Sequence, residues 1–440
     1  MYPEFRFFAH SSLINQPTRP LNAVRLLPPT GPVRSTIPLA SSKSESNRAL
    51  IIDALTGFGC DLQNLSTARD TQTMIRLLKS DERTADVLDA GTTMRFLTAY
   101  FSITGQPKLM TGTPRMCERP IGILVDALRT LGADITYLEN DGYPPLQLNG
   151  FTNSGRNRLS IRGDMSSQYI SALLMVAPLL PDGLILQLTG AIGSRPYIEM
   201  TIEQMRYFGA DVQTDWNEKN ITVLPKPYTP KPYRIESDWS GASYWYSVAA
   251  LANDEDMEIE LLGLKPKSLQ GDSAIVDIMR SMGVVSTFND TGVILTKGPA
   301  ESLLTWDFTD CPDLAQTVAV CAAVNRIALT MTGIESLKIK ETDRVRALQT
   351  ELQKIGAELV EVEPNHRYQV RPLAHSVASV PRIETYDDHR MAMAFAPVAM
   401  QREIVIEEPG VVAKSYPSFW DDMARVVTVE PIGEGTNHPA

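Results

Sequence analysis

One short pattern returns four times along this 440-residue chain: an amphipathic helical segment, a glycine, and then a strand-like run. The glycines stand 77, 74 and 73 residues apart, at Gly132, Gly209, Gly283 and Gly356. A glycine directly after an amphipathic segment is typical of a helix that ends in the left-handed conformation. The nearly constant spacing predicts structural repeats that each contain helices and strands.

A second pattern has the same period. Nearly all-apolar helical segments begin with small or polar residues near positions 91, 166, 240, 312 and 387, and one more begins at Ser44, so the first of six units is shortened. Helices that are apolar on every side have to be buried on every side, which favours the centres of two domains. A boundary is expected within residues 225–237, where four prolines interrupt regular structure and three units fall on each side.

The charged stretch from Lys338 to Arg346 carries four cations and two carboxylates, directly before a helical pattern entered near Thr342. Free N–H groups at a helix start attract anions, and Lys340 and Arg344 would add two cations. If the repeated units orient their helices alike, several helix starts converge to form an anion pocket. The alternatives are a solvated helix start with ordinary ion pairs and, for the Ser, Thr and Asp residues, simple N-caps.

The net charge, the apolar runs and the cysteine and histidine content exclude several classes of partner and site. A net charge of −11 argues against non-specific binding to nucleic acid or to a membrane surface. The longest apolar run, at residues 172–180, falls short of the ~20 residues that cross a bilayer. Four cysteines without a C-x-x-C pair and five histidines without a metal-binding cluster predict no zinc site and no disulfide framework. We expect a cytoplasmic protein, with residues 1–20 as an extension.

Seven segments stand in the order found in 5-enolpyruvylshikimate-3-phosphate synthases, and the chain resembles that family from about residue 21 to residue 427. These segments are Ser42 to Arg48, Ala90 to Arg95, Pro114 to Ile121, Ser166 to Gln168, Lys340 to Arg344, Asp388 to Met393, and Lys414 with Ser415. The resemblance implies an α/β (α+β) fold of two domains. Each domain has three βαβαββ units around buried helices, and the active site lies in the cleft between the domains.

The resemblance also implies where the chain crosses between the domains, near Ala40 and near Ser237. Domain one would then comprise residues 21–40 and 237–440, and domain two residues 41–236. The implied reaction joins phosphoenolpyruvate to the 5-hydroxyl of shikimate 3-phosphate and releases phosphate, with no metal and no cofactor. The expected partners are therefore small-molecule substrates, and a monomer is expected.

Two phosphorylated carboxylic acids need cations around them, and Arg binds carboxylate and phosphate with two parallel hydrogen bonds. By resemblance, the phosphoenolpyruvate side comprises Lys43, Gly91, Arg115, Gln168, Arg344, Arg390 and Lys414. The shikimate 3-phosphate side comprises Ser44, Arg48, Ser166, Ser167, Ser194, Asp313, Ser336 and Lys340. Asp313 resembles the base that takes the hydroxyl proton, Glu341 the group that exchanges the proton at the methylene carbon, and Lys43 shares the acid role.

Several residues depart from the common pattern of the family, among them Ala40 and Ser41, which stand where Pro-Gly is usual. Asp89 and Ser336 each stand where Asn is frequent, Phe96 replaces a frequent Pro, and Cys117 replaces a frequent Lys. Cys117 matters for a rival with the same fold and chemistry, the UDP-N-acetylglucosamine enolpyruvyl transferase, which typically uses a loop cysteine. A second rival is a non-catalytic six-repeat binding scaffold, but it gives no reason for Lys, Glu and Arg at repeated helix starts.

Overall fold

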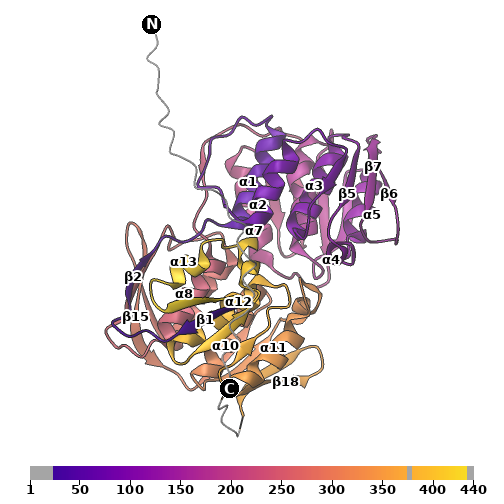
Figure 1. The fold of residues 1–440 in the computed structure, drawn as a ribbon. Coiled ribbons are helices and arrows are strands. Elements are labelled where there is room, and N and C mark those ends of the chain that lie inside the picture. Colours follow the sequence, from indigo (N-terminus) through magenta and orange to yellow (C-terminus); the bar gives the residue numbers. More distant parts are fainter. Residues whose placement is uncertain (1–22, 374–378, 434–440) are drawn as a thin grey trace, which may run out of the picture.

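The computed structural model describes residues 23–373 and 379–433, which form two domains, one above the other in Figure 1. The expected extension at residues 1–20 lies outside this range. One hydrophobic core draws on residues between Leu50 and Tyr228, and the other joins Val24 to Leu39 with residues between Trp239 and Val427. This division of the cores supports our proposal that domain two spans residues 41–236 and that domain one comprises residues 21–40 and 237–440.

The two chain crossings lie side by side. Ser41 and Ser237 form an isolated antiparallel bridge, and the amide of Ser42 donates to the carbonyl of Glu236 over 2.9 Å. The amide of Asp238 donates in turn to the carbonyl of Ala40 over 2.8 Å. Two adjacent segments of the chain therefore form the covalent link between the domains.

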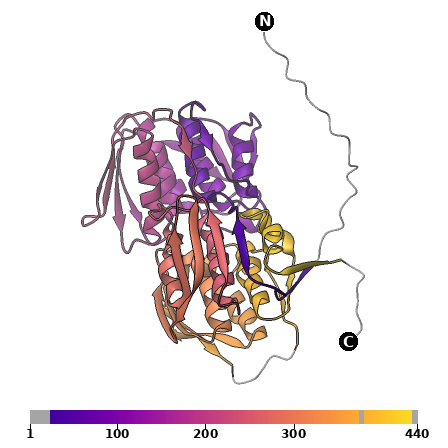
Figure 2. The ribbon, with the colours of Figure 1, turned by 90° about the vertical axis from the view of Figure 1, so that its left-hand side faces the viewer.

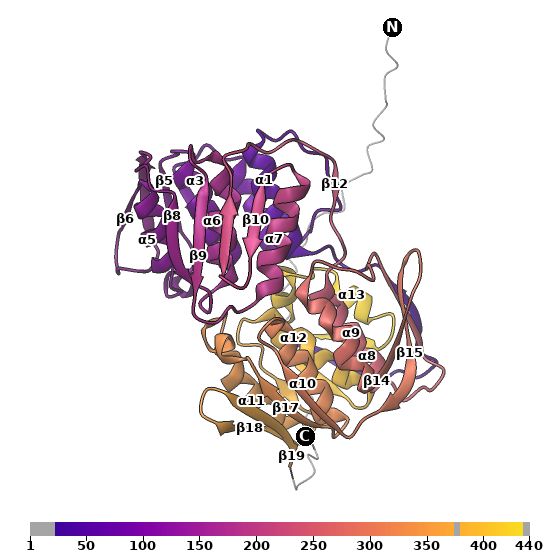
Figure 3. The same ribbon diagram turned by 180° about the vertical axis from the view of Figure 1, so that it is seen from behind.

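Five four-stranded sheets in the described part of the chain share one strand pattern, with two parallel strands followed by two antiparallel ones. Domain two contains β4 (Thr84–Asp86), β5 (Lys108–Thr111), β7 (Leu146–Phe151) and β6 (Ala133–Tyr137) in one sheet, and β8 (Arg158–Arg162), β9 (Leu184–Thr189), β11 (Asn220–Val223) and β10 (Val212–Asp215) in the next. Its shortened unit has only β12 (Tyr233–Arg234) and β3 (Leu62–Gln63). Figure 3 shows β8, β9 and β10 on one face of this domain.

Two sheets of domain one include strands from the beginning of the chain. Its sheets are β2 (Arg34–Ile37), β13 (Glu258–Leu262), β15 (Gly292–Ala300) and β14 (Met282–Phe288); β16 (Leu303–Asp307), β17 (Ala328–Thr332), β19 (Arg367–Pro372) and β18 (Ala357–Glu363); and β20 (Arg382–Ile383), β21 (Ile404–Glu407), β1 (Ala23–Leu27) and β22 (Thr428–Ile432). β2 pairs in parallel with β13, and β1 lies between β21 and β22. Figure 2 shows the indigo N-terminal segment crossing this domain beside the yellow C-terminal one.

The remaining regular elements of the described residues are helices. In domain two they are α1 (Lys43–Leu55), α2 (Arg69–Leu78), α3 (Gly91–Ile103), α4 (Pro114–Cys117), α5 (Gly122–Leu131), α6 (Ser167–Val176), η1 (Ala177–Leu179) and α7 (Arg195–Tyr207). In domain one they are α8 (Trp239–Leu251), η2 (Gly271–Ala274), α9 (Ile275–Arg280), η3 (Pro312–Leu314), α10 (Ala315–Val324), η4 (Glu335–Ile339), α11 (Arg344–Lys354), α12 (His389–Phe395), η5 (Ala396–Met400), η6 (Pro409–Lys414) and α13 (Phe419–Met423).

The apolar helices lie at the domain centres, as predicted. Every residue of α6 from Tyr169 to Val176 is buried, and so is every residue of α10 from Ala315 to Ala322. In domain two α6 packs on α3, and in domain one α10 packs on α8 and α12. Each buried leucine- or valine-sized side chain contributes roughly 1.5–3 kcal/mol to folding, so these central helices hold their domains together.

The repeated glycines follow helices and adopt positive φ, which confirms their predicted role. Gly132 directly follows α5 with φ 115°, and a Cβ there would lie 1.9 Å from the carbonyl oxygen of Thr152. Gly209, Gly283 and Gly356 lie two or three residues beyond their helices with φ between 86° and 93°. Only glycine fits the first of these positions, because both its φ and the close backbone approach exclude a side chain.

The helix predicted to begin near Thr342 begins at Arg344 instead. The side chain of Asp343 accepts a hydrogen bond from the amide of Arg346 over 3.0 Å and is therefore the N-cap of α11. Lys340 precedes the helix, in the extended segment that follows η4. Lys340 and Arg344 therefore do not share a helix face but approach the cleft from two different backbone segments.

Candidate active site

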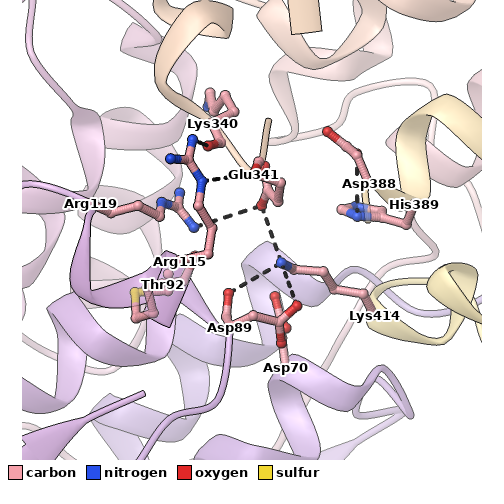
Figure 4. Close-up of polar contacts among 12 residues, drawn as sticks. Asp70, Asp89, Thr92, Arg115, Arg119, Lys340, Glu341, Asp388, His389 and Lys414 are labelled. Atoms are coloured by element: carbon pink, nitrogen blue, oxygen red, sulfur yellow. Dashed lines mark hydrogen bonds and ion pairs between the residues drawn. The ribbon is translucent and has the colours of Figure 1, made fainter. Parts of the chain in front are cut away.

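A polar pocket opens between the two domains. Domain two contributes Arg95, Arg119, Pro120, Met165, Ser166, Ser167, Gln168, Tyr169 and Ser194 to its wall, and domain one contributes Ser336, Ile339 and Lys340. Figure 4 shows the charged side chains that face one another beside it, with Arg115 and Arg119 on one side and Lys340, Glu341 and Lys414 on the other. The cleft expected between the domains is therefore present, and it is lined by several of the predicted residues.

The guanidinium group of Arg344 is the centre of the charged cluster. Its side chain is only 2% exposed, and it donates to Asp313 over 3.0 Å, to Glu341 over 2.8 Å and to Asp388 over 2.6 Å. Asp388 in turn caps α12, because its side chain accepts from the amide of Arg390 over 2.8 Å. One buried cation thus fixes both predicted catalytic carboxylates relative to the start of a buried helix.

Asp313 lies among three cations. Arg344 and Arg390 donate to separate oxygens of its carboxylate, over 3.0 and 2.8 Å, and the Lys340 ammonium lies 3.9 Å away. Burial raises the pKa of this carboxyl group, but the charges of Arg390, Lys340 and Arg344 outweigh burial and hold the pKa well below its usual range. Asp313 is therefore ionised and can accept a proton.

Glu341 is the second ionised carboxylate. Its oxygens lie 2.8 Å from Arg344, 3.5 Å from the Lys414 ammonium and 3.9 Å from the guanidinium of Arg119. Burial raises the pKa of Glu341, yet Arg344, Lys414 and Arg119 hold it well below its usual range. Glu341 connects cations from both domains, since Arg119 belongs to domain two.

Asp89, which stands where Asn is frequent in the family, points into the cleft. Its carboxylate lies 2.9 Å from the Lys414 ammonium and accepts two hydrogen bonds from Arg69, over 3.1 and 2.9 Å. Burial raises the pKa of Asp89, but Lys414 and Arg69 lower it overall. The negative charge of Asp89 therefore offsets one of the site's own cations.

The remaining predicted cations differ in how far they reach the pocket. Lys43 forms an ion pair of 2.9 Å with Asp70 beside the cleft. Arg48 is 2% exposed and donates to Thr201 over 2.7 Å and to the carbonyl of Ser44 over 2.8 Å. Burial lowers the pKa of Arg48 to about 10. Arg48 thus joins α1 to α7 inside domain two.

Arg115 and Arg119 differ in burial, and only Arg119 lines the pocket. Arg115, which was predicted, has a side chain that is 47% exposed and donates to the backbone carbonyls of Lys340 and Glu341. Arg119 was not singled out, yet its side chain is 10% exposed and lines the pocket. No described residue accepts a hydrogen bond from its Nε. A buried guanidinium with unused donors is a ready site for an anion.

The predicted polar residues of domain two converge on the same wall. Ser166 caps α6 by accepting from the amide of Gln168, as the N-cap alternative supposed, whereas Ser167 and Ser194 line the pocket without capping. The side-chain amide of Gln168 donates to Thr92 over 3.2 Å. Ser194 adopts a left-handed φ of 53° at the start of α7, which is a strained conformation common at functional sites.

His389 is buried beside this cluster, and neither of its ring nitrogens has a hydrogen-bond partner among the described residues. Burial and then the charges of Lys43 and Arg390 lower the pKa of His389 well below its usual value, so the ring is neutral. Among residues 23–373 and 379–433, no group of three or more His, Cys, Asp or Glu side chains has a metal-binding arrangement. The four cysteines are free thiols.

Comparison with known proteins decides the family. The sequence profile described as EPSP synthase (3-phosphoshikimate 1-carboxyvinyltransferase) matches residues 79–423. A protein named 3-phosphoshikimate 1-carboxyvinyltransferase from Bacteroides fragilis is 47% identical over 422 residues, which cover 93% of this chain and 99% of that protein. The chain belongs to the EPSP synthase family.

Other members of the EPSP synthase family match over nearly the same length at lower identity. Proteins with the same name from an Enterobacter species and from Escherichia coli are 36% and 35% identical, and each match covers at least 91% of this chain and 98% of the relative. The solved EPSP synthase from Acinetobacter baumannii superposes with a TM-score of 0.73 at 20% identity, covering 93% of this chain and all of that one. This similarity shows the fold, and it confirms the predicted two-domain α/β architecture.

Proposed function

We propose that this EPSP synthase family member transfers the enolpyruvyl group of phosphoenolpyruvate to the 5-hydroxyl of shikimate 3-phosphate, giving 5-enolpyruvylshikimate 3-phosphate and phosphate. The observation that carries the proposal is the arrangement of Arg344, which holds Asp313 and Glu341 on either side of itself in a cleft lined by cations. Two anionic substrates need this positive surround, and two opposed carboxylates suit a reaction that moves two protons.

The proposed binding roles follow the position of each group. Lys43, Arg119, Arg344, Arg390 and Lys414 supply the positive charge for phosphoenolpyruvate, and Gly91 and Gln168 border the same space. Ser44, Ser166, Ser167, Ser194, Ser336 and Lys340 hold shikimate 3-phosphate, and Arg48 fixes the carbonyl of Ser44 from behind. Ser336 and Lys340 face Ser166 and Ser194 across the pocket, so the substrate would bridge the domains.

In the proposed mechanism the 5-hydroxyl oxygen bonds to the central carbon of phosphoenolpyruvate while Asp313 takes the hydroxyl proton. The electron pair of the breaking double bond takes a proton to the methylene carbon, and the ammonium group of Lys43 supplies this proton, because Glu341 is ionised. This gives a tetrahedral intermediate with a methyl group. Glu341 then removes a methyl proton, the double bond returns, and phosphate departs with its electron pair.

The low pKa of Asp313 fits this role once the substrates are considered. Without substrates, Arg344 and Arg390 both donate to this carboxylate. Anionic substrates draw these cations away, and the weaker pairing raises the pKa of Asp313 toward the range of an effective base. Substrate binding thus prepares the base.

The second candidate is the UDP-N-acetylglucosamine enolpyruvyl transferase, favoured only by Cys117. Its Sγ donates to the carbonyl of Gly112 over 3.8 Å and does not line the pocket. Phosphate release with phosphoenolpyruvate and each acceptor in turn separates the two. We expect turnover with shikimate 3-phosphate; turnover with UDP-N-acetylglucosamine alone would overturn the proposal.

We also propose a monomer in the cytoplasm. Both walls of the pocket come from one chain, so the site needs no second copy. Four free thiols suit a reducing compartment. None of the helices within residues 23–373 and 379–433 is long and apolar enough to cross a membrane.

A further inference from the structure

The start of α7 is where domain two docks on domain one. The amide of Ser194 donates to the carbonyl of Thr309 over 2.9 Å, and the amide of Arg195 donates to the carboxylate of Asp310 over 3.1 Å. One turn further on, the hydroxyl of Tyr197 donates to Oδ1 of Asp272 over 3.0 Å. Figure 3 shows α7 of domain two standing over domain one. Three successive contacts therefore fix this helix on the opposite domain.

The backbone next to Asp272 is shaped for this close approach. A Cβ at Gly271 would lie 2.8 Å from the carbonyl oxygen of Asp310 and 2.9 Å from Cβ of Pro196, at the start of α7. Such distances leave no room for a side chain. Asp272 itself is 1% exposed, so its carboxylate is withdrawn from water and depends on the groups around it.

A path of hydrogen bonds connects Asp272 at this interface with the proposed base, Asp313. Its Oδ2 accepts a hydrogen bond from the hydroxyl of Ser240. Ser240 in turn accepts from Nη2 of Arg390 over 3.4 Å, and the same Nη2 donates to Asp313 over 2.8 Å. The donors and acceptors alternate along this path, so every member is satisfied when Tyr197 is docked.

We propose that Asp272 is a positioning residue that links the docking of α7 to the placement of Arg390 and Asp313. The inference rests on the proposed function of the site and extends it, because it identifies how closure of domain two orders the base in domain one. When the domains separate, Asp272 loses the Tyr197 hydroxyl and is left with an unfilled acceptor. It then competes with Asp313 for the guanidinium of Arg390, so Arg390 is no longer placed between the base and the proposed phosphoenolpyruvate site.

A double-mutant cycle with Tyr197→Phe and Asp272→Asn tests this link. Each change removes one side of the interdomain hydrogen bond with little change in shape, and each should lower kcat about ten-fold. The double variant should lose no more than the larger single loss, because both changes break the same link. Ser240→Ala, the next member of the path, should give a similar loss and should not add to Asp272→Asn.

Tyr233→Phe is the matched control. It removes another tyrosine hydroxyl that donates to a buried carboxylate, that of Glu45, but within domain two. We expect it to lower thermal stability while kcat stays within two-fold. Losses of Tyr197→Phe and Asp272→Asn that multiply in the double variant, or a Tyr197→Phe effect equal to that of the control, would overturn the proposal. A parent protein without turnover of shikimate 3-phosphate would instead refute the proposed function.

Discussion

The ammonium nitrogen of Lys414 in domain one lies 2.9 Å from a carboxylate oxygen of Asp89 in domain two, and Figure 4 shows this contact spanning the cleft. The Lys414 side chain is only 3% exposed, so water screens the pair weakly. Lys414 also lies 3.5 Å from Glu341. A cation proposed to bind phosphoenolpyruvate is thus already shared between two carboxylates of the protein.

Asp89→Asn should therefore strengthen phosphoenolpyruvate binding. The amide keeps the shape but removes the negative charge that competes with the substrate for Lys414, so KM for phosphoenolpyruvate should fall about three- to ten-fold. Steady-state kinetics at low ionic strength measure the effect. Asp164→Asn, which breaks the exposed pair with Arg162 outside the site, should leave KM unchanged; a higher KM in Asp89→Asn would contradict the prediction.

Arg119 and Arg115 form a second test, since they lie four residues apart and differ in burial. Arg119→Ala removes a pocket cation with unused donors and should lower kcat/KM by roughly a hundred-fold or more. Arg115→Ala removes an exposed side chain that holds two backbone carbonyls, and its loss should stay below about ten-fold. Equal losses, with unfolding temperatures matched to the parent, would show that the position of Arg115 matters as much as that of Arg119.

Cys117→Ser should leave turnover within a few-fold. The thiol is half-buried, makes one long contact to the carbonyl of Gly112, and does not reach the pocket. An essential nucleophile or acid would cost roughly two orders of magnitude or more. A loss of that size in the phosphate-release assay would favour the transferase that uses a loop cysteine.

Asp238 gives the site region a pH-dependent stability. Burial raises the pKa of Asp238 to about 7, although Arg390 lowers it. The folded protein therefore holds this proton more tightly than the unfolded chain, whose aspartate pKa is about 3.9. The stability contributed by Asp238 is present in full below about pH 4 and is lost as the pH rises through 7.

Asp238→Asn isolates this effect, because the amide oxygen can still accept the hydrogen bond from the amide of Gly241 that caps α8. Relative to the variant, the parent should lose on the order of 3 kcal/mol of unfolding free energy between pH 5 and pH 8. Urea unfolding at both pH values measures it. Asp343→Asn, which changes the N-cap of α11 in the same way, controls for the effect of replacing a capping carboxylate. A difference in unfolding free energy between the parent and Asp238→Asn that does not change with pH would refute the raised pKa of Asp238.

Local patterns predicted the fold and much of the cleft because their causes are local. A glycine after an amphipathic segment marks a helix end, and an all-apolar helix must be central, so the repeats and their buried helices could be inferred. Asp313 and Arg344 were singled out by the resemblance to the family, and they lie in η3 and at the first residue of α11.

The features that the sequence did not predict depend on contacts between segments that are far apart in the chain. The spacing of Arg115, on the short helix α4, and Arg119, just beyond its end, does not reveal which of the two side chains points inward. The hydrogen bond between Tyr197 and Asp272 joins residues 75 positions apart across the domain boundary, and no local pattern marks it. Arg119 lies inside one of the seven segments that resemble the family, and this position was the only feature of the sequence that pointed to it.

Gly91 provides the last prediction, which concerns glyphosate, a phosphonate that resemblance places in the phosphoenolpyruvate site. A Cβ at Gly91 would lie 2.7 Å from Nη1 of Arg119 and 2.8 Å from Nη1 of Arg95, at the first residue of α3. Both distances are below normal contact, and both arginine residues are at most 8% exposed, so Gly91→Ala must shift the end of at least one of these arginine side chains.

The shifted arginine side chain should weaken the binding of glyphosate more than the binding of the shorter phosphoenolpyruvate. The same resemblance implies that glyphosate, the longer molecule, approaches Gly91 more closely than phosphoenolpyruvate does, so Gly91→Ala should raise its inhibition constant at least ten-fold more than it raises KM for phosphoenolpyruvate. Phe96, one turn along α3, is fully buried, and the guanidinium of Arg48 lies 5.4 Å from its ring centroid. Its bulk therefore rests in the core of domain two rather than in the pocket, which favours a parent protein that glyphosate inhibits competitively with phosphoenolpyruvate. Inhibition constants for the parent and for Gly91→Ala decide the matter: a parent that is already resistant, or equal losses for both ligands, would show that the methyl group does not act through this approach.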